Sequence, residues 1–559
     1  MNRALIFALI ILCMPLVLSA QNGHWEWANT ALGILATEAK KVAVDNDGNV
    51  YVTGSFDNAI RFDGVDYHSK GGSDIFLVKY DSKGKIIWAE TIGGIADDAG
   101  TGIAVDAQGN ILLTGDYSDS VQFGSMTLSS FGDLDVFTVK YNSSGTVLWA
   151  RSGGSIYRER AADIRTDKNG NIYIAGEFGE GSPSPKPDTT FAYFNNDTIL
   201  GMKGSEIYLV KYNAQGDVLW SKGLGGSGNT GTVGGIFVDD NSNVIIGGSF
   251  GYYLELDHII LLSNAKGFVL GDMFIAKYDS NGNAIWAKSV SGENNGGHAG
   301  GAIWRGYVVA DNAGDVYITG SYLDCDMLFP GTTLSSTGSS NVYFAKYSGT
   351  GDFQWARKVF YGFSYSNGIA TDGKDNILIT GTLTTTGRLG KDSLVSAGGD
   401  DVFIAKYDKQ GNDISGVIAG GSNRDYANSI AIGPDGTILV AGAIFSNPAK
   451  FGVHSISSAY NKSMFVAKFQ GYPTGVSTTG SLSSRVDVYP NPTRDLLYVN
   501  GVEVGTQIKV LNALGQEVYS GNANSPKIVI NTSELLPGIY ILHLTKEHTK
   551  TTTHRFVKE

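Results

Sequence analysis

The sequence predicts an all-β protein built from one repeated unit. A stretch running from Val42 to Phe56 recurs along the chain, and each copy is followed by a variable loop and a second recurring stretch, first seen from Asp74 to Trp88. Gly is frequent, at 75 residues, and much of it stands at hairpin tips, where it reaches positive φ without strain. Tandem self-similarity of this kind fixes the architecture before any other feature.

The second half of the unit gives the number of repeats. A Lys-Tyr or Lys-Phe pair, a hairpin Gly and a Trp return in the same order. The aromatic positions are Tyr80, Tyr141, Tyr212, Tyr278, Tyr347, Tyr407 and Phe469; the glycines are Gly84, Gly145, Gly216, Gly282, Gly351 and Gly411; the tryptophans are Trp88, Trp149, Trp220, Trp286 and Trp355. Seven copies follow, with Ile414 near the Trp position of the sixth.

Each repeat contains four strand-like runs. In the first repeat they are Lys41–Asp45, Asn49–Ser55, Asp74–Tyr80 and Lys85–Thr91. Apolar and β-branched residues fill these runs, and Gly, Asn and Asp bound them, as in short antiparallel strands. Four-stranded sheets repeated around an axis are the blades of a β-propeller. The sequence therefore predicts a seven-bladed β-propeller over residues 21–470.

The N-terminal segment is expected to close the ring. Repeat seven stops at Gly471 without a fourth strand, whereas Glu26-Trp-Ala-Asn-Thr30 matches the fourth-strand text Ile87-Trp-Ala-Glu-Thr91. A strand supplied from the N-terminus completes the last blade and removes exposed sheet edges. An open array of stacked sheets is the alternative, but it would have no use for a displaced strand.

Strand order assigns the loops to two faces. If strand four is outermost, strand one lines the axis, and the linkers between repeats share a face with the long connections between strands two and three. The longest such connection runs from Phe178 to Ser205. Long variable loops on a rigid scaffold are common binding sites, so this face is the expected binding face.

The repeat resembles the bacterial SBBP-type β-propeller repeat. The resemblance lies in Gly-Ile-Ala-Val-Asp-x-x-Gly-Asn followed by Asp-x-Phe-x-x-Lys-Tyr-x-x-x-Gly-x-x-x-Trp, and it covers roughly residues 24 to 470. It implies a secreted or surface protein, mostly without assigned chemistry in the family.

Composition and the first residues indicate export. Arg3, the apolar run Ala4–Leu18 and a small-residue site ending at Ala20 are typical of a secretory signal over residues 1–20. A membrane anchor is the alternative, but the run is shorter than the roughly 20 residues that a span needs. We expect no membrane span after signal removal. The net charge of −12 argues against nucleic acid as a partner. Removal of Cys13 leaves Cys325 without an internal disulfide partner.

The tail is predicted to be a separate small domain. Residues 471–484 form a Gly/Ser/Thr linker, and residues 485–559 alternate strands and turns as in a β-sandwich. The tail resembles the type A C-terminal sorting domain of the type IX secretion system of Bacteroidota. The resemblance implies a partnership with that secretion machinery and release or attachment at the outer-membrane surface. Its motif residues are Pro490, Asn491, Pro492, Gly515, Gly538, Tyr540 and Lys558.

Two acidic patterns invite a metal interpretation. The turn Asp45-Asn-Asp-Gly-Asn49 and its counterparts lack the spacing of a calcium loop, so they are interpreted as hydrogen-bonded turns. A second acidic position opens strand three: Asp74, Asp135, Glu206, Asp272, Asn341, Asp401 and Ser463. It could form a cation-binding ring, but backbone bonding at the strand start is the favoured interpretation. No metal or cofactor is assigned.

No catalytic motif is found, and no residue is assigned a catalytic role. The strand-four Trp is interpreted as packing between blades. Aromatic and Arg side chains are enriched in binding hot spots, and they gather in the long-loop regions. The candidate ligand-binding residues are Tyr157, Arg158, Arg160, Tyr252, Tyr253, Tyr322, Tyr365, Arg424 and Tyr426.

The leading hypothesis is a secreted or outer-membrane surface-attached, non-enzymatic propeller that binds an extracellular protein or glycan through its long-loop face. An extracellular polysaccharide hydrolase or lyase with carboxylates on the same face is one alternative. A structural surface component without a discrete ligand is the other.

Overall fold

A computed structural model describes residues 23–33, 35–180, 190–194, 197–201, 206–225, 231–263, 269–293, 301–336, 340–360, 364–384, 386–389, 392–458, 462–470, 487–489, 493–500, 502, 504–512, 515–525, 527–545 and 551–558. The predicted signal sequence and the linker 471–484 lie outside these ranges. The described residues are all-β, and no helix among them could cross a membrane. The chain divides into two compact units, with the boundary between Pro473 and Thr474.

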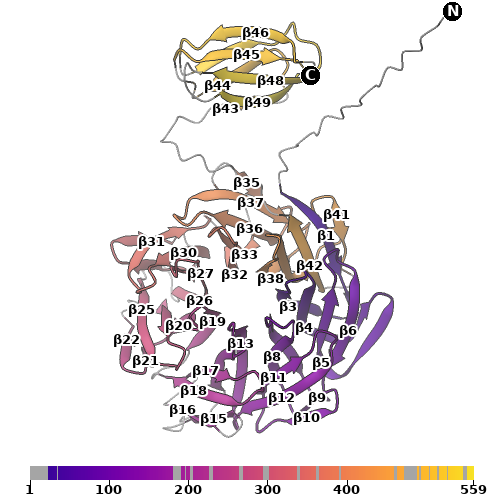
Figure 1. Cartoon of the computed structure of the whole chain (residues 1–559), viewed down its shortest axis with the longest axis vertical. Helices are drawn as coiled ribbons and strands as arrows, with labels where there is room; N and C mark the ends of the chain where they lie inside the picture. Colours follow the sequence, from indigo (N-terminus) through magenta and orange to yellow (C-terminus); the bar gives the residue numbers. More distant parts are fainter. Residues whose placement is uncertain are drawn as a thin grey trace, which may run out of the picture. The chain divides into compact units, whose positions relative to one another are not determined.

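The first compact unit contains seven antiparallel four-strand groups within the described residues (Figure 1). Group one contains β3 (Thr37–Val44), β4 (Val50–Phe62), β5 (Val65–Tyr80) and β6 (Ile86–Ile92), and group two contains β7 (Asp98–Val105), β8 (Ile111–Tyr117), β11 (Asp135–Tyr141) and β12 (Val147–Gly154). Group three contains β13 (Arg158–Thr166), β14 (Ile172–Glu180), β17 (Glu206–Tyr212) and β18 (Val218–Leu224), and group four contains β19 (Thr232–Val238), β20 (Val244–Phe250), β24 (Asp272–Tyr278) and β25 (Ala284–Glu293). Group five contains β26 (Gly301–Ala310), β27 (Val316–Leu323), β30 (Asn341–Tyr347) and β31 (Phe353–Lys358), and group six contains β32 (Ser364–Thr371), β33 (Ile377–Leu383), β36 (Asp401–Tyr407) and β37 (Asp413–Ala419). Group seven contains β38 (Asp425–Ile432), β39 (Ile438–Ile444), β42 (Ser463–Gln470) and β1 (His24–Thr30).

The apolar core lies between neighbouring sheets. The second and third strands are buried on both faces, so their residues read as continuous apolar runs. One core cluster joins Tyr51 and Leu77 of group one to Ile103 and Leu113 of group two. First strands contact one another in succession, and β38 of group seven contacts β3 of group one. In Figure 1 these first strands surround the centre of the unit.

The N-terminal strand completes the last group, as the sequence predicts. β1 pairs antiparallel with β42, with Trp27 opposite Lys468 and Thr30 opposite Phe465. Trp27 also packs in one core cluster with Val52 of group one. Groups seven and one are therefore in direct contact through the first described residues of the chain. Each sheet remains open at its own edges.

The extra residues between strands two and three form hairpins, apart from Val269–Leu270, which pairs in parallel with β26. The short strands of these regions are β9 (Ser120–Phe123), β10 (Met126–Ser129), β15 (Thr190–Phe194), β16 (Asp197–Gly201), β21 (Tyr253–Leu256), β22 (Ile259–Leu262), β23 (Val269–Leu270), β28 (Asp326–Phe329), β29 (Thr332–Leu334), β34 (Thr386–Leu389), β35 (Asp392–Val395), β40 (Ala449–Phe451) and β41 (His454–Ile456). Several reach back to the fourth strand of the preceding group: β15 pairs with β12, and β28 with β25. β2 (Leu32–Gly33), after β1, pairs with the extension of β4 in the same way. These short strands therefore pair with strands of the neighbouring group and connect the two sheets.

The Asp turns between first and second strands are held by hydrogen bonds. In the second group, Asp106 Oδ1 accepts from the backbone N–H groups of Gln108 (3.0 Å) and Asn110 (2.8 Å), and Oδ2 accepts from Asn110 Nδ2 (2.9 Å). The same pattern recurs at Asp45, Asp167, Asp239 and Asp372. The turn interpretation is confirmed, because both carboxylate oxygens are used within the turn.

The acidic residues that open strand three bond to backbone. Asp135 Oδ2 accepts from the N–H of Phe131 (2.7 Å), and Asp74 Oδ2 accepts from that of Lys70 (3.1 Å). Burial raises the pKa of Asp74 to about 6 and that of Asp135 to about 7. No group of three potential metal ligands occurs in the part of the chain that the structure describes. The favoured interpretation, backbone bonding at the strand start, is confirmed for these two residues.

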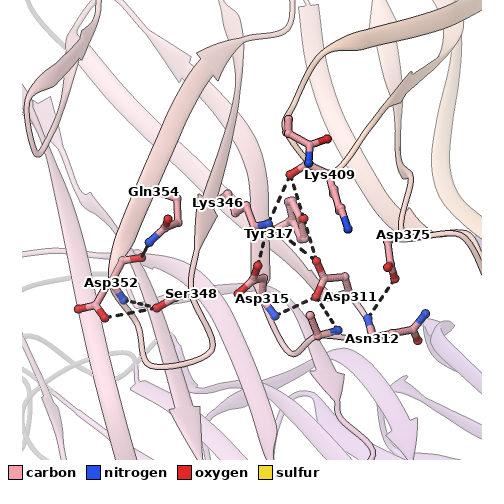
Figure 2. A network of polar contacts seen from close by, with 12 residues as sticks. Asp311, Asn312, Asp315, Tyr317, Lys346, Ser348, Asp352, Gln354, Asp375 and Lys409 are labelled. Atoms are coloured by element: carbon pink, nitrogen blue, oxygen red, sulfur yellow. Dashed lines mark hydrogen bonds and ion pairs between the residues drawn. The ribbon is translucent and has the colours of Figure 1, made fainter. Parts of the chain in front are cut away.

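Tryptophans of strand four link neighbouring groups at four junctions through indole hydrogen bonds, which confirms the predicted packing role there. The indole N–H groups of Trp27, Trp149, Trp220 and Trp286 donate to the backbone carbonyls of Ser82, Ala214, Ser280 and Gly349. Lysines of strand three add to this contact. Figure 2 shows the junction of groups five and six, where Lys346 pairs with Asp315 (2.7 Å) and donates to the carbonyl of Lys409 (3.3 Å). The recurring Lys, Trp and Gly are therefore parts of one inter-sheet contact.

Where the structure describes it, the second compact unit contains two sheets. One contains β43 (Asp487–Tyr489), β44 (Leu496–Asn500) and β47 (Lys527–Asn531), and the other contains β46 (Glu517–Asn522), β45 (Gln507–Leu511), β48 (Gly538–Thr545) and β49 (Thr551–Lys558). Their apolar residues share one core cluster, with Val499 from the first sheet and Val510, Leu542 and Phe556 from the second. This is the β-sandwich arrangement that the alternating strands predict.

A candidate ligand site in the axial cavity

A bulge in every first strand directs residues into a central cavity. In six groups the register shifts by one residue, at Lys40, Thr101, Ala162, Gly234, Asn367 and Asn428. All six line one cavity of about 1020 Å³. At a bulge the alternation of side chains along the strand is interrupted, because the extra residue has no partner in the second strand. That residue faces the axis.

Group five departs from this pattern. Its register shift between Trp304 and Tyr307 leaves two residues, Arg305 and Gly306, without partners in β27. Arg305 has φ of 52°, in the left-handed region that a residue with Cβ seldom adopts. Its guanidinium lines the cavity and donates to the Tyr307 hydroxyl (3.1 Å). Backbone strain of this kind is often found at functional sites.

Two aromatic side chains form part of the cavity wall beside Arg305. Trp304 is 40% exposed and Tyr365, from the neighbouring group, is 37% exposed. Their ring centroids are 6.4 Å apart with planes tilted by 38°. Most Trp and Tyr residues of this chain are packed between sheets, so this exposed pair is a candidate contact surface for a ligand.

The acidic groups of the cavity are already engaged. Glu38 pairs with Lys462 (2.6 Å) and accepts from Asn428 Nδ2 (2.8 Å); although burial opposes ionisation, these contacts lower its pKa. Asp116 accepts from the backbone N–H of Ala161 (2.6 Å), and burial raises the pKa of Asp116 to about 7. Glu177 accepts from the N–H of Val233 (3.1 Å).

The basic groups are less fully paired. Lys41 lies 3.4 Å from Asp163. Within the described residues, neither Lys40 nor Arg305 has a carboxylate at ion-pair distance, although both line the cavity. The hydroxyl of Thr101, also in the wall, is buried without a hydrogen-bond partner in the described part of the chain. The cavity therefore combines cations, an unsatisfied hydroxyl and two exposed aromatic faces.

The cavity lies toward the face that the sequence predicts for binding. Its wall includes residues near the beginnings of first strands, such as Glu38 and Arg160, and near the ends of second strands, such as Glu177, Ser249 and Ser321. First strands begin where the linkers between groups end, and second strands end where the inserted hairpins start.

The structure brings only some of the predicted residues to this site. Arg160 and Tyr365 line the cavity. Tyr426 contacts it indirectly, because its hydroxyl donates to Glu38 (3.3 Å). Arg158 instead lies near Asp133 (3.4 Å), and Arg424 pairs with Asp400 (2.9 Å).

The remaining predicted residues lie elsewhere. Tyr157 stands in a bend next to β13, and Tyr252, 75% exposed, precedes the hairpin strand β21 that begins at Tyr253. None of these three lines the cavity. The assignment of Tyr322 to a binding loop is wrong. It lies in β27 and is fully buried in the apolar core, because its side chain faces the neighbouring sheet.

Sequence reasoning missed Trp304, Arg305, Lys40 and Asp116. A signal was present, because the first strand of repeat five reads Ala302-Ile-Trp-Arg-Gly-Tyr307 and holds one residue more than its counterparts between the paired positions. An alignment of the seven first-strand sequences would have shown this additional residue.

The predicted sorting residues fall in the second compact unit. Pro490, Asn491 and Pro492 lie outside the described residues. Tyr540 is buried and stacks on Phe556, with ring centroids 5.6 Å apart. Lys558, also buried, ends β49 beside Gly538, which begins β48; Gly515 has φ of 77° in the turn between β45 and β46.

Comparison with known families decides what this unit is. Residues 487–559 match the family described as the secretion system C-terminal sorting domain. The tail matches a sorting domain. Residues 32–55 match the beta-propeller repeat family named SBBP, so both resemblances seen in the sequence are confirmed. The sorting domain indicates interaction with the secretion machinery and a secreted or surface location.

Curated relatives extend the likeness of the repeats. The chain is 25% identical over 525 residues to an uncharacterized WD repeat-containing protein, L264, of Acanthamoeba polyphaga mimivirus, covering 76% of this chain and 36% of that protein. It is 28% identical over 160 residues to the regulatory protein FlaEY of Caulobacter vibrioides, covering 28% of this chain and 17% of that protein. The chain thus spans well under half of the length of either relative.

Solved structures give only distant likeness. PorZ, an essential surface component of the type IX secretion system of Porphyromonas gingivalis, covers 95% of this chain and 100% of its own at 11% identity and a TM-score of 0.23. A puromycin hydrolase variant covers 83% of this chain and 58% of its own at 11% identity and a TM-score of 0.40. Likeness at this level has no bearing on ligand or activity.

Proposed function

We propose that this protein is a non-enzymatic, closed seven-bladed β-propeller that binds an extracellular glycan or protein in its axial cavity, and that its sorting domain delivers it to the outside of the cell. The cavity carries the proposal. Exposed aromatic faces, cations without carboxylate partners and a buried unpaired hydroxyl converge there from several strands. Such convergence of polar groups in a large concave site is typical of binding sites.

Closure of the ring supports the proposal. β1 pairs with β42, and the first strands of groups seven and one are in contact. A closed ring holds residues from seven sheets around one axis, so a ligand site built from them is positioned before binding. Such preorganisation lowers the entropic cost of association.

Binding of the full-length protein to glycan and protein arrays tests the proposal. Ala162→Trp introduces an indole into the cavity wall and is expected to weaken specific binding at least tenfold. Ile95→Trp, at a site that is 75% exposed and does not line the cavity, is the matched control. Saturable binding that Ala162→Trp leaves unchanged would contradict the assignment of the cavity, and absence of any binding would favour a structural surface component.

A polysaccharide hydrolase or lyase remains the second candidate. It is favoured by the raised pKa of Asp116, about 7, since a carboxyl group protonated near neutral pH can act as a general acid. Asp116 and Glu177 both line the cavity. Release of reducing ends from polysaccharides that bind, lost in Asp116→Asn, would support this candidate over the non-enzymatic one.

A further inference from the structure

We infer that the axial cavity recognises a carboxylate-bearing sugar, a uronic acid within an acidic glycan, and that Trp304, Arg305 and Tyr365 form the subsite that binds it. The inference rests on the proposed function and specifies its ligand class. It is drawn from three features of the cavity wall, each with its own chemistry.

Charge is the first feature. Arg305 and Lys40 line the cavity without a carboxylate at ion-pair distance among the described residues. Four cationic residues share the wall with three acidic ones: Glu38 pairs with Lys462, burial raises the pKa of Asp116 to about 7, and Glu177 accepts a backbone hydrogen bond. An anionic ligand therefore meets a locally positive site in a protein whose net charge is −12. A planar guanidinium binds a carboxylate through two parallel hydrogen bonds, so carboxylate fits this site better than a diffuse anion.

Shape is the second feature. The exposed rings of Trp304 and Tyr365 adjoin each other, Trp304 is next to Arg305 in the chain, and all three residues line the cavity. A flat aromatic face packs against the flat C–H face of a sugar ring, and Trp and Tyr also offer a polar edge. A uronic acid presents a C–H face and a carboxylate on one ring. An acidic peptide offers the carboxylate alone on a flexible side chain.

Hydrogen-bonding capacity is the third feature. The hydroxyl group of the half-buried Thr101 is buried and unpartnered in the described part of the chain, and Ser249, Ser321 and Thr232 add hydroxyl groups to the same wall. Hydroxyl groups both donate and accept, so they suit a ligand rich in hydroxyls. Few apolar ligands of this volume would compensate for their desolvation.

The backbone of Arg305 explains how the guanidinium reaches the cavity. The two-residue bulge of β26 holds Arg305 at φ of 52°, a conformation that favours Gly. Retaining Arg there is unfavourable for the fold, so a role for its side chain gives a reason for its presence. Because Gly adopts positive φ readily, Arg305→Gly removes the guanidinium and also relieves the backbone strain at this position.

The test is isothermal titration of the full-length protein with three uronate oligosaccharides: trigalacturonate, trimannuronate and a hyaluronan tetrasaccharide. Each is paired with its carboxyl-reduced counterpart, and a hexaglutamate peptide is the acidic non-sugar probe. At least one uronate is expected to bind at least tenfold more tightly than its reduced form and than hexaglutamate.

Variants locate the subsite. Arg305→Gly and Trp304→Ala are each expected to weaken uronate binding at least tenfold, Lys40→Gln severalfold, and Arg305→Gly should not lower the melting temperature. Arg61→Gln, which removes an exposed guanidinium paired with Asp66, is the control and should leave affinity unchanged. Lys40→Gln provides an independent readout if Trp304→Ala fails to fold.

Other outcomes overturn the inference in distinguishable ways. Equal binding of uronates and reduced forms, unaffected by Arg305→Gly, would exclude carboxylate recognition. Tighter binding of hexaglutamate would assign the site to acidic peptides. If none of the three uronates binds, but an array ligand binds and Ala162→Trp abolishes that binding, the uronate ligand class is refuted and the proposed function is kept. If neither the uronates nor any array ligand binds, both the inference and the proposed function are refuted.

Discussion

At the residue scale, one Asp in each Asp turn combines two roles. Asp106 closes the turn and, with Oδ2, also pairs with the buried Lys140 (2.9 Å). Asp45 makes the same turn bonds, but no ion pair joins it to Lys79, whose amine instead donates to the carbonyl of Ser143. Asp45 Oδ2 accepts instead from the buried Tyr51 hydroxyl (2.9 Å), so the two positions compare an ion pair with a neutral hydrogen bond on the same turn.

We predict that Asp106→Ala destabilises the protein more than Asp45→Ala does. Removing Asp106 leaves the buried Lys140 without its carboxylate partner, which costs about 3–5 kcal/mol, whereas loss of the turn bonds and of the Tyr51 hydroxyl bond at Asp45 costs about 1–3 kcal/mol. Urea unfolding followed by Trp fluorescence measures both. Equal losses would show that the ion pair contributes no more than the hydrogen bond from Tyr51. Addition of a calcium chelator should change neither wild-type midpoint nor slope, because the carboxylates are used within the turns.

Buried carboxyl groups make stability depend on pH. Burial raises the pKa of Asp98 from its usual 3.8 to about 7, while its Oδ2 accepts from the N–H of Gly94 (2.7 Å). Because the folded pKa lies above the unfolded one, the protonated form is favoured by folding. The stabilisation from Asp98 is fully present below about pH 4 and is lost as the pH rises to about 7.

Asp98→Asn should therefore flatten the pH profile. Asn keeps an acceptor for Gly94 without a charge, so the variant is expected to be more stable than wild type at pH 8 by on the order of 1–3 kcal/mol and similar to it at pH 4. Thermal unfolding at both pH values measures the difference. Asp66→Asn, at an exposed pair with Arg61, is the control. A variant less stable than wild type at pH 8 would show that the ionised carboxylate is needed.

At the element scale, the hairpin between strands three and four locks neighbouring sheets. Gly216 has φ of 82°, and a Cβ placed on it would lie 2.9 Å from the ring of Trp149 in the preceding group. Gly314, in an Asp turn, has nearly the same φ, 83°, but nothing within 4 Å of the Cβ position. The two glycines share backbone strain and differ in the Trp contact.

Gly314→Ala is expected to destabilise by about 1 kcal/mol, from positive φ alone, and Gly216→Ala by about 2–3 kcal/mol, because the methyl group also displaces the indole. Denaturant unfolding compares them directly. Similar losses in the two variants would mean that Trp149 shifts without cost and that the lock is loose.

At the largest scale, the last four-strand group of the first compact unit depends on β1, which pairs with β42. Deleting residues 23–31 removes Trp25 and Trp27 from the core and exposes the edge of β42. We expect a lower melting temperature and concentration-dependent association, because an unpaired strand edge pairs with other chains. A peptide of residues 23–33 added in trans should partly restore the melting temperature. A truncated protein that stays monomeric with an unchanged melting temperature would disprove closure by β1.

The sorting domain governs export of the whole molecule. Deletion of residues 486–559 is expected to retain the propeller in the periplasm, since the machinery reads this domain as an address. Cell fractionation and surface proteolysis measure the location. Leu536→Ala, at a site in the same domain that is 78% exposed, is the control and should be exported normally. Surface delivery of the deletion variant would show that export does not require the domain.

The sequence by itself determined the repeated unit, the place of the N-terminal strand, the Asp turns and the nature of the tail. Each is a local or periodic property: Asp at a turn bonds to its own neighbours, and Trp27 repeats the text around Trp88. The repeated text therefore predicts the repeated contact.

Only the tertiary structure decided where the candidate site lies. Trp304, Tyr365 and Lys40 come from three different sheets and meet because their strands surround one axis. Tyr322 and Tyr365 look alike in the sequence, but pairing directs the first into the core and leaves the second in the cavity wall. Which face a side chain takes depends on register, and a single bulge reverses it, so composition and spacing alone do not reveal it.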